Sequence, residues 1–309
     1  NFRELRAEVV GRGRNLASKT DTEVVAHLVT LYLEDGLAPP EATFAALKRL
    51  EGAFALALVF AGHTDLLIGA RRGNPLAIAH GKGEMYLGSD ALALAPLSRR
   101  ITYLEEGDWA VITKSDATIF DAEGAEIRRP VTLTEPSDGL AEKGGYRHFM
   151  LKEIYEQPQV IGDTLRAFVN PATRSVSLPE LPFDPARVTR LTLVACGTAY
   201  YAAMVAKYWL EGIARIPCEV DIASEFRYRG ADMADEGAMV VVSQSGETAD
   251  TLAALRYARA QNQPTLAVVN VPESTIARES DAVLRTFAGP EIGVASTKAF
   301  TTQLTVLAC

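Results

Sequence analysis

Six consecutive residues in the second half of the chain have the composition of an anion-binding turn. Residues 243–248 read Ser-Gln-Ser-Gly-Glu-Thr, with three hydroxyls around one glycine. The preceding residues 238–242 form an apolar run, which is typical of a strand buried on both faces of a parallel sheet. From Ala249 onward, apolar residues recur at helical spacing. The first amides of that helix, together with its dipole, would favour a phosphate at the turn.

A helix cap is the alternative explanation for these hydroxyls. One Ser or Thr suffices to cap a helix, and an acid such as Glu247 often accompanies it. A second loop, residues 196–199 with the sequence Cys-Gly-Thr-Ala, follows another apolar run at 191–195. If both runs are strands of one parallel sheet, the two loops lie at its carboxyl edge, where ligands bind in such folds. This favours a phosphate site, and the absence of a GxGxxG motif disfavours a dinucleotide.

The elements that must position these loops alternate between strand and helix. We predict strands at 191–195, 217–222, 238–242 and 265–270, and helices at 200–212, from 223, at 249–261 and at 273–281. A helical segment begins at Tyr146, and Pro158 should kink it or divide it in two. The alternation predicts an α/β fold with a doubly wound parallel sheet.

The first half of the chain separates its helices from its strands, which predicts an α+β domain. We expect helices at 2–10, 20–36 and 41–50, the second opened by a capping box of Thr20 and Glu23. Strands should follow at 53–60, 66–70, 76–79, 84–88 and 109–113, with a hairpin at 117–120 and 125–128. We therefore assign residues 1–130 to the first domain, 131–145 to a linker rich in Pro and Gly, and 146–309 to the second domain.

Composition excludes several classes of function. The net charge of −8 argues against a nucleic-acid-binding surface. No apolar run approaches the ~20 residues that span a bilayer, and we expect no signal peptide, so we expect a cytoplasmic protein that does not bind membranes. The 3 cysteines and 4 histidines lack the spacing of a disulfide framework or a metal site. We expect neither a metal nor another cofactor.

Longer motifs along the whole chain resemble those of the glutamine–fructose-6-phosphate aminotransferases, also called glucosamine-6-phosphate synthases. They are residues 20–25, 104–108, 146–150, 152–154, 156–158, 196–199, 225–229, 243–251, 278–281 and 291–303. The resemblance implies an N-terminal-nucleophile glutaminase domain followed by a sugar-isomerase (SIS) domain. In this family glutamine is hydrolysed by the first half, and the ammonia is used by the second to convert fructose 6-phosphate to glucosamine 6-phosphate. It also implies a homodimer formed through the isomerase half.

The resemblance assigns binding roles residue by residue. Asp21 matches the aspartate that holds the amino group of glutamine, whereas without the resemblance it is a first-turn acid of a helix. The residues that match the sugar-phosphate site are Cys196, Gly197, Thr198, Ser243, Gln244, Ser245, Thr248, Val294 and Ser296. Cys196 is not a nucleophile in this scheme. For Val294 and Ser296 the alternative is a buried loop before a helix at 297–307. Ala199 departs from the serine expected there, which puts one hydrogen bond in doubt.

The chain ends suggest a fragment of a longer protein. Residue 1 is Asn, and the apolar helical run at 300–309 has no cap. The nucleophile of the glutaminase and the acid–base residues of the isomerase would lie outside the chain, so we assign no catalytic residue within it. The sequence predicts that the fragment binds a sugar phosphate without completing the reaction. Two alternatives remain: a non-catalytic phosphosugar-binding module, and a sugar-phosphate isomerase or deglycase without a glutaminase.

Overall fold

A computed structural model describes residues 1–89, 91–133 and 143–309. The chain divides into two compact units, Asn1–Pro136 and Ser137–Cys309. Part of the predicted linker, residues 134–142, lies outside the described residues. Within the described part of the chain, no helix is long and apolar enough to cross a membrane.

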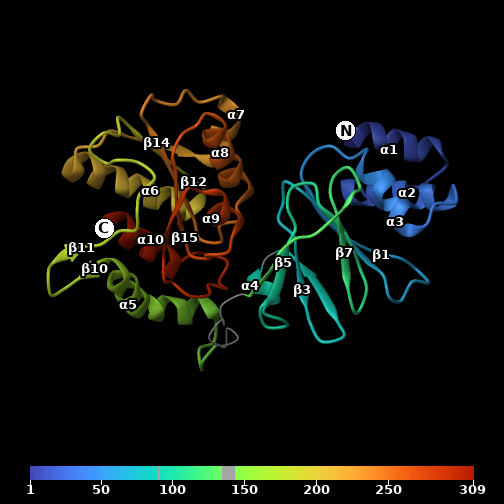
Figure 1. The fold of residues 1–309 in the computed structure, drawn as a ribbon, viewed down its shortest axis with the longest axis horizontal. Helices are drawn as coiled ribbons and strands as arrows, with labels where there is room; N and C mark the ends of the chain where they lie inside the picture. Colours follow the sequence, from blue (N-terminus) through green and yellow to red (C-terminus); the bar gives the residue numbers. More distant parts are fainter. Residues whose placement is uncertain (90, 134–142) are drawn as a thin grey trace. The chain divides into compact units, whose positions relative to one another are not determined.

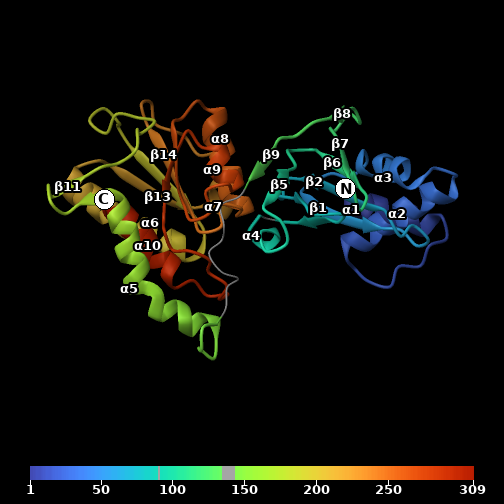
Figure 2. The same cartoon turned by 60° about the horizontal axis from the view of Figure 1, so that its bottom comes forward.

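The first unit has an α+β architecture with two antiparallel sheets (Figures 1 and 2). Its helices are α1 (Phe2–Gly11), α2 (Asp21–Glu34), α3 (Pro39–Leu47) and α4 (Ala91–Leu94). Its strands are β1 (Phe54–Val59), β2 (Leu67–Arg72), β3 (Ala77–His80), β4 (Met85–Gly88), β5 (Arg100–Tyr103), β6 (Trp109–Ile112), β7 (Ala117–Phe120), β8 (Glu126–Ile127) and β9 (Val131–Leu133). The strand orders are β1-β2-β6-β7-β8 and β4-β3-β5-β9.

The core of this unit lies in layers. Helices α1 to α3 pack on one face of the first sheet, where Leu28 and Ala46 join Ile68 and Trp109 in one cluster. On the opposite face, residues of the first sheet meet the second sheet in another cluster, which includes Ile78. Consecutive residues of β2 and β6 are therefore buried, because each of these strands is covered on both sides.

Three local predictions for this unit are corrected. Thr20 precedes α2 but its side chain makes no capping hydrogen bond. Glu23 instead accepts hydrogen bonds from the amides of Ala17 and Ser18, each at 2.6 Å, so the capping box is wrong. Strand β5 was not predicted. Residues 131–133, assigned to the linker, form β9, which pairs with β5 through Ile101 and Thr132.

The second unit is a doubly wound α/β fold with the sheet order β13-β12-β14-β15-β16, parallel throughout these pairs. Its sheet strands are β12 (Leu191–Ala195), β13 (Cys218–Ile222), β14 (Ala238–Ser243), β15 (Thr265–Val269) and β16 (Ala282–Arg285), and β10 (Val169–Asn170) pairs with β11 (Ser175–Val176). Its helices are α5 (Phe149–Phe168), α6 (Gly197–Trp209) with a π-helical turn (Leu210–Ala214), α7 (Ala223–Arg229), α8 (Ala249–Ala260), α9 (Thr275–Glu279) and α10 (Lys298–Ala308).

Helices cover both faces of this parallel sheet (Figure 1). Leu193 and Val240 face α5, α6 and α10, whereas Val194 and Val241 face α7, α8 and α9. Because neighbouring residues of each strand are buried on opposite faces, β12 and β14 are continuous apolar runs. The α/β prediction is confirmed.

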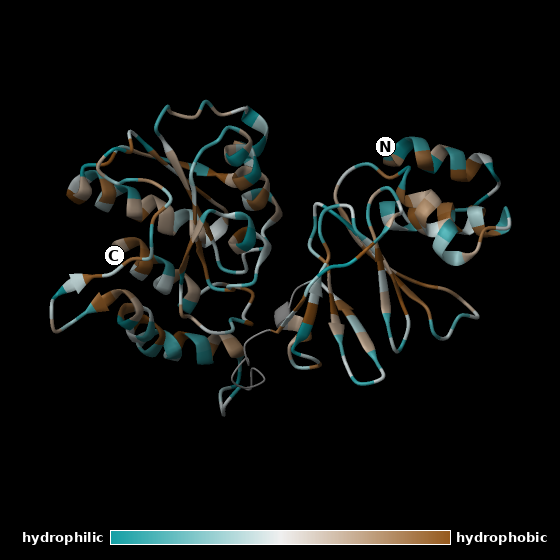
Figure 3. Ribbon diagram, in the orientation of Figure 1, coloured by the Kyte–Doolittle hydropathy of each residue, from teal (hydrophilic) through white to brown (hydrophobic). Residues whose placement is uncertain are grey.

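Helix α5 runs through Pro158 as one element, so the predicted division at that proline is wrong. It combines hydrophilic and hydrophobic residues along its length (Figure 3). Glu153 and Phe168 are among its buried residues, while Tyr155 is exposed. Its inner face packs against α10 and contributes a buried carboxylate to the second unit.

Candidate functional site

The turn after β14 folds back on its own hydroxyl groups. Ser243 is 3% exposed, and its Oγ accepts a hydrogen bond from the Gly246 amide at 3.0 Å. The Ser245 Oγ accepts one from the Glu247 amide at 3.1 Å. A hydroxyl that accepts a hydrogen bond from an amide still has its own proton to donate. The turn can therefore present hydroxyl donors to an anion without leaving these two amides unsatisfied.

Gly246 is the residue that allows this shape. Its φ is +66°, in the left-handed region that glycine adopts without strain. A Cβ at this position would overlap the Oγ and Cβ of Ser274. The Gly246 carbonyl also accepts a hydrogen bond from the Ile276 amide at 3.0 Å. The turn is thus packed directly against the start of α9.

The side chains of Thr248 and Glu247 do not cap helix α8, so the helix-cap explanation does not account for their contacts. Thr248 precedes α8 but its side chain makes no capping hydrogen bond, and its Oγ1 lies 3.1 Å from the Ser243 Oγ. The Glu247 carboxylate, which the helix-cap explanation assigns to the start of α8, accepts a hydrogen bond from the Thr275 amide at 2.8 Å, in the first turn of α9. Because first-turn amides have no acceptor within their helix, those of α8 face the turn as potential anion donors.

The loop after β12 lies beside this turn. The parallel register pairs Ala195 of β12 with Val242 of β14, so Cys196 and Ser243 leave neighbouring strands at the same edge. Gly197 follows with a φ of +58° and opens α6. The Thr251 hydroxyl, in the first turn of α8, donates to the Cys196 Sγ at 4.0 Å. The structure therefore brings together the two loops that the sequence places at one edge.

Ala199, where the family resemblance implies a serine, points into the protein. It is 7% exposed and belongs to the core cluster between α6 and the sheet. Thr198, one residue earlier, is exposed. Of these two side chains, Thr198 is the one that can reach a ligand in solution.

The charge next to the turn is neutralised within the protein. Asp250 lies in the first turn of α8, where a carboxylate would repel a phosphate. The Arg227 guanidinium of α7 pairs with it at 2.7 Å. An incoming anion therefore meets an ion pair rather than an isolated negative charge.

Asn270, at the end of β15, joins the turn to a third loop. Its amide donates to the Gln244 carbonyl at 3.2 Å. Its side chain donates to the Gly289 carbonyl at 2.8 Å and accepts from the Ala288 amide at 3.0 Å. One residue thus connects residues 243–248 to the segment that follows β16.

Val294 and Ser296 lie further along that segment. The Val294 side chain is fully exposed, with a relative exposure of 108%, so the alternative of a buried loop is wrong for this residue. Ser296 is partly buried, and its hydroxyl donates to the Glu291 carboxylate at 3.1 Å. Glu291 also accepts from the Thr297 amide at 2.8 Å, ahead of α10.

In the first unit, Asp21 is the first residue of α2 and is exposed. Its carboxylate accepts a hydrogen bond from the Thr22 amide at 2.8 Å. This contact is local and leaves the rest of the carboxylate in solvent. Its assignment to the amino group of glutamine stays a prediction.

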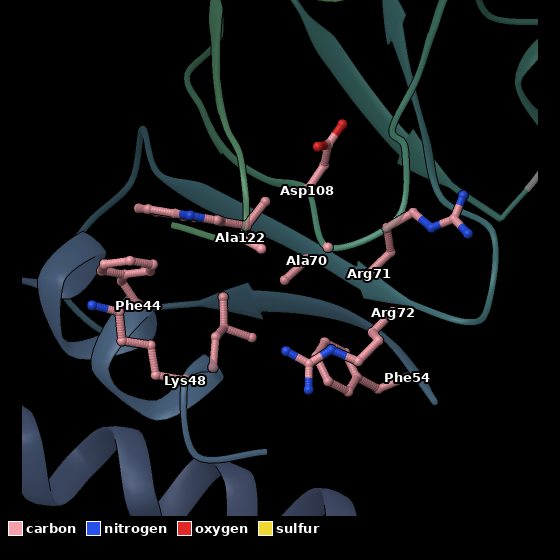
Figure 4. Close-up of a pocket in the computed structure, with 11 residues that line it drawn as sticks. Phe44, Lys48, Phe54, Ala70, Arg71, Arg72, Asp108 and Ala122 are labelled. Carbon is pink, nitrogen blue, oxygen red and sulfur yellow. The ribbon is translucent and has the colours of Figure 1, made fainter. Parts of the chain in front are cut away.

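The first unit also contains a small cavity between α3 and the first sheet (Figure 4). Its volume is about 20 Å³, which holds about one water molecule and not an amino acid. Phe44 stacks on Trp109 at 5.3 Å on one side. The Asp108 carboxylate points away from Phe44 and Lys48. This cavity is a packing feature of the core.

Sequence reasoning missed three residues that hold the loops in place: Glu153, Asn270 and Glu291. Glu153 and Glu291 lie within motifs that we quoted, and Asn270 ends a predicted strand. Their partners could not be found by spacing, since Glu153 bonds to the Ile292 amide across 139 residues. The residue pattern within one motif does not reveal a contact between two motifs.

Two family models match the chain. The glutamine amidotransferase domain matches residues 1–96, and the SIS domain matches residues 186–309. The glutamine–fructose-6-phosphate aminotransferases [isomerizing] of Gluconobacter oxydans and Bradyrhizobium diazoefficiens are 56% and 59% identical over 308 and 309 residues. Each alignment covers 100% of this chain and 51% of the relative. The chain therefore spans about half the length of these curated relatives.

A solved structure is also similar to part of this chain. It is the C-terminal domain of glucosamine-fructose-6-phosphate aminotransferase from Francisella tularensis, with 48% sequence identity and a TM-score of 0.51. The match covers 55% of this chain and 48% of that one. The chain thus carries a glutamine amidotransferase region followed by an SIS domain, and over its whole length it is similar to curated glutamine–fructose-6-phosphate aminotransferases [isomerizing].

Proposed function

We propose that the chain is part of an enzyme that converts fructose 6-phosphate to glucosamine 6-phosphate with glutamine as the nitrogen donor, and that its SIS unit binds the sugar phosphate. The supporting observation is the hydrogen bonding of residues 243–248. The Ser245 Oγ accepts the Glu247 amide, which leaves the hydroxyl proton for a phosphate oxygen. The first turn of α8 follows with further amide donors.

The other assigned residues have supporting roles in this proposal. The Ser243, Gln244 and Thr248 positions complete the phosphate site, and Cys196, Gly197 and Thr198 contact the sugar with Val294 and Ser296. Asp21 binds the amino group of glutamine in the first unit. The cytoplasmic location expected from the sequence belongs to the same proposal.

A calorimetric titration with fructose 6-phosphate tests the binding proposal. We expect saturable binding of fructose 6-phosphate and no detectable binding of fructose at the same concentrations, because the phosphate supplies the charged contacts. Inorganic phosphate should bind more weakly and compete. A chain that does not bind fructose 6-phosphate, or binds fructose equally well, would contradict the proposal.

Within this chain the site binds and orients its ligand. Enolisation of a ketose phosphate requires a base poised beside its carbonyl. The Glu247 carboxylate, which lies in the turn, is engaged by the Thr275 amide at 2.8 Å. We therefore expect no glucosamine 6-phosphate when the chain is incubated with glutamine and fructose 6-phosphate. Product above a no-protein control would show that this assignment is wrong.

The two alternatives from the sequence are less well supported. A match to a glutamine amidotransferase domain over residues 1–96 argues against a sugar-phosphate isomerase or deglycase that lacks a glutaminase. A module that only binds phosphosugars has no use for a glutamine amidotransferase domain, so residues 1–96 also argue against that alternative. The aminotransferase assignment accounts for both halves of the chain.

We also propose that the SIS unit forms a homodimer. The outward face of α6 exposes Tyr201, Met204 and Tyr208 by 59%, 40% and 76%. Exposed apolar side chains at helical spacing favour association. Sedimentation equilibrium should give a dimer that Tyr208→Glu weakens. A monomer at all concentrations would contradict this part of the proposal.

A further inference from the structure

A buried carboxylate of α5 holds the loop that contains Val294. Glu153 is 2% exposed, and its Oε1 accepts hydrogen bonds from the amides of Ile292 at 2.6 Å and Gly293 at 3.0 Å. We propose that Glu153 is a positioning residue for the sugar phosphate: by fixing these two amides, it sets the direction in which Val294 and Ser296 face the ligand. This inference rests on the proposed function.

The contact between α5 and the loop requires a carboxylate at residue 153 and a glycine at residue 293. Hydrogen bonds from amides to a charged acceptor are stronger than neutral ones, and they offset the cost of burying the charge. A Cβ at Gly293 would lie 2.5 Å from the Glu153 Oε2 and 3.5 Å from the Met150 Cα. A side chain at residue 293 would therefore displace the carboxylate from the two amides.

The loop is also held at its far end. Glu291 accepts hydrogen bonds from the amides of Thr297 at 2.8 Å and Ala299 at 3.1 Å. Lys298, which is 4% exposed, reaches the Glu156 carboxylate of α5 at 2.8 Å. Residues 291–297 are thus connected to α5 near both ends of the loop.

Val294 lies between these two attachments, and it is fully exposed. An apolar side chain in solvent adds nothing to the stability of the loop that displays it. Contact with a ligand explains both its exposure and the restraint of its backbone. The Asn270 contacts with Gln244 and Gly289 connect the same segment to the phosphate turn.

The test separates positioning from a general contribution to folding. Inorganic phosphate uses only the turn at 243–248, whereas fructose 6-phosphate also requires the loop at 291–297. In calorimetric titrations, Glu153→Gln should raise the Kd for fructose 6-phosphate roughly tenfold and leave that for inorganic phosphate within about twofold. Hydrogen exchange of the Ile292 and Gly293 amides should accelerate in the same variant.

Two further variants complete the experiment. Gly293→Ala displaces the carboxylate but keeps its charge, so it should cause the same selective loss and provides a second test if Glu153→Gln folds poorly. Asp163→Asn removes the charge of an exposed ion pair with Arg166 on the same helix and should change neither affinity.

Any result other than a selective loss of affinity for fructose 6-phosphate overturns the inference. If both variants bind fructose 6-phosphate as the wild type does, Glu153 does not position the loop, while the proposed function stands. An equal loss of affinity for both ligands would make Glu153 a residue of general structural importance. If the wild-type chain does not bind fructose 6-phosphate, the proposed function fails as well.

Discussion

Ser245 and Thr248 differ in the hydrogen bonds that their hydroxyls make. The Ser245 Oγ accepts the Glu247 amide at 3.1 Å, whereas the Thr248 Oγ1 lies 3.1 Å from the Ser243 Oγ and makes no capping contact. A helix cap requires only one hydroxyl, whereas this turn has three. The hydroxyls of Ser243 and Ser245 close the turn by accepting hydrogen bonds from its amides. We propose that hydroxyl protons, rather than turn amides, are the donors that residues 243–248 offer to a phosphate.

Gly246 should tolerate no side chain. Gly246→Ala places a Cβ at a φ of +66° and into Ser274, so it should lower the free energy of unfolding of the Ser137–Cys309 unit by about 2 kcal/mol or more. Hydrogen exchange of β14 amides measures this change. Gly212→Ala is the matched control, since a Cβ there meets nothing within 4 Å. Equal protection in the two variants would contradict the role of Gly246.

Glu23 should titrate far below an ordinary glutamate. Hydrogen bonds from the Ser18 hydroxyl and the Ala17 amide lower the pKa of Glu23 from 4.5 to about 2. A depressed carboxylate pKa stabilises the folded state above the unfolded value, and this contribution is lost as the pH falls from about 4.5 to about 2. An NMR titration of the Glu23 side-chain carboxyl carbon measures the midpoint. A midpoint near 4.5 would show that the contacts do not persist in solution.

At the scale of elements, the loop between β5 and β6 is held by buried charges. Arg129 contacts Asp108 through two hydrogen bonds at 2.8 Å and 2.9 Å, and the Asp108 side chain is 1% exposed. The Arg71 side chain, 2% exposed, donates to the Leu104 carbonyl at 2.9 Å. The motif at 104–108, which the sequence contributes to the family resemblance, thus has a structural role in this unit.

Loss of the Asp108 charge should destabilise the first unit. Asp108→Asn leaves the Arg129 guanidinium with a weaker acceptor beside Glu105, and the loss of a hydrogen bond to a charged group costs about 1.5–3 kcal/mol. In a Trp209→Phe background, Trp109 is the remaining tryptophan and reports denaturant unfolding of this unit. Asp35→Asn breaks the exposed pair with Arg12 and should have little effect. Similar midpoints for the two variants would contradict this account.

Elements with strong periodicity were predictable, and short ones that depend on distant partners were not. The apolar run at 238–242 predicts β14, and helical spacing from Ala249 predicts α8. Strand β5 has only Ile101 and Thr102 buried, and it forms because β3 and β9 pair with it. The capping-box spacing predicts that Glu23 accepts a hydrogen bond from the Thr20 amide. It does not show that the preceding loop also offers the amides of Ala17 and Ser18, which Glu23 binds instead.

For the whole molecule, the sequence motifs predicted a glutaminase domain followed by an SIS domain. The rules of parallel sheets predicted that the loops at 196–199 and 243–248 lie at the same edge of the sheet. The attachments of the third loop were not predictable, because Glu153 and Gly293 are 140 residues apart in sequence. Such contacts depend on the packing of α5 against α10, which no local pattern encodes. The binding roles of Asp21 and of all nine residues assigned to the sugar-phosphate site stay predictions.

The most direct test of the central claim is a comparison of fructose 6-phosphate binding by the wild-type chain and by the Ser245→Ala/Thr248→Ala variant. Isothermal titration calorimetry should show at least a roughly tenfold loss of affinity, because two donors to the phosphate are removed. Circular dichroism and the thermal transition should stay close to those of the wild type, since both side chains are only partly buried. An unchanged Kd in a folded variant would contradict the claim and would leave residues 243–248 as the start of a helix.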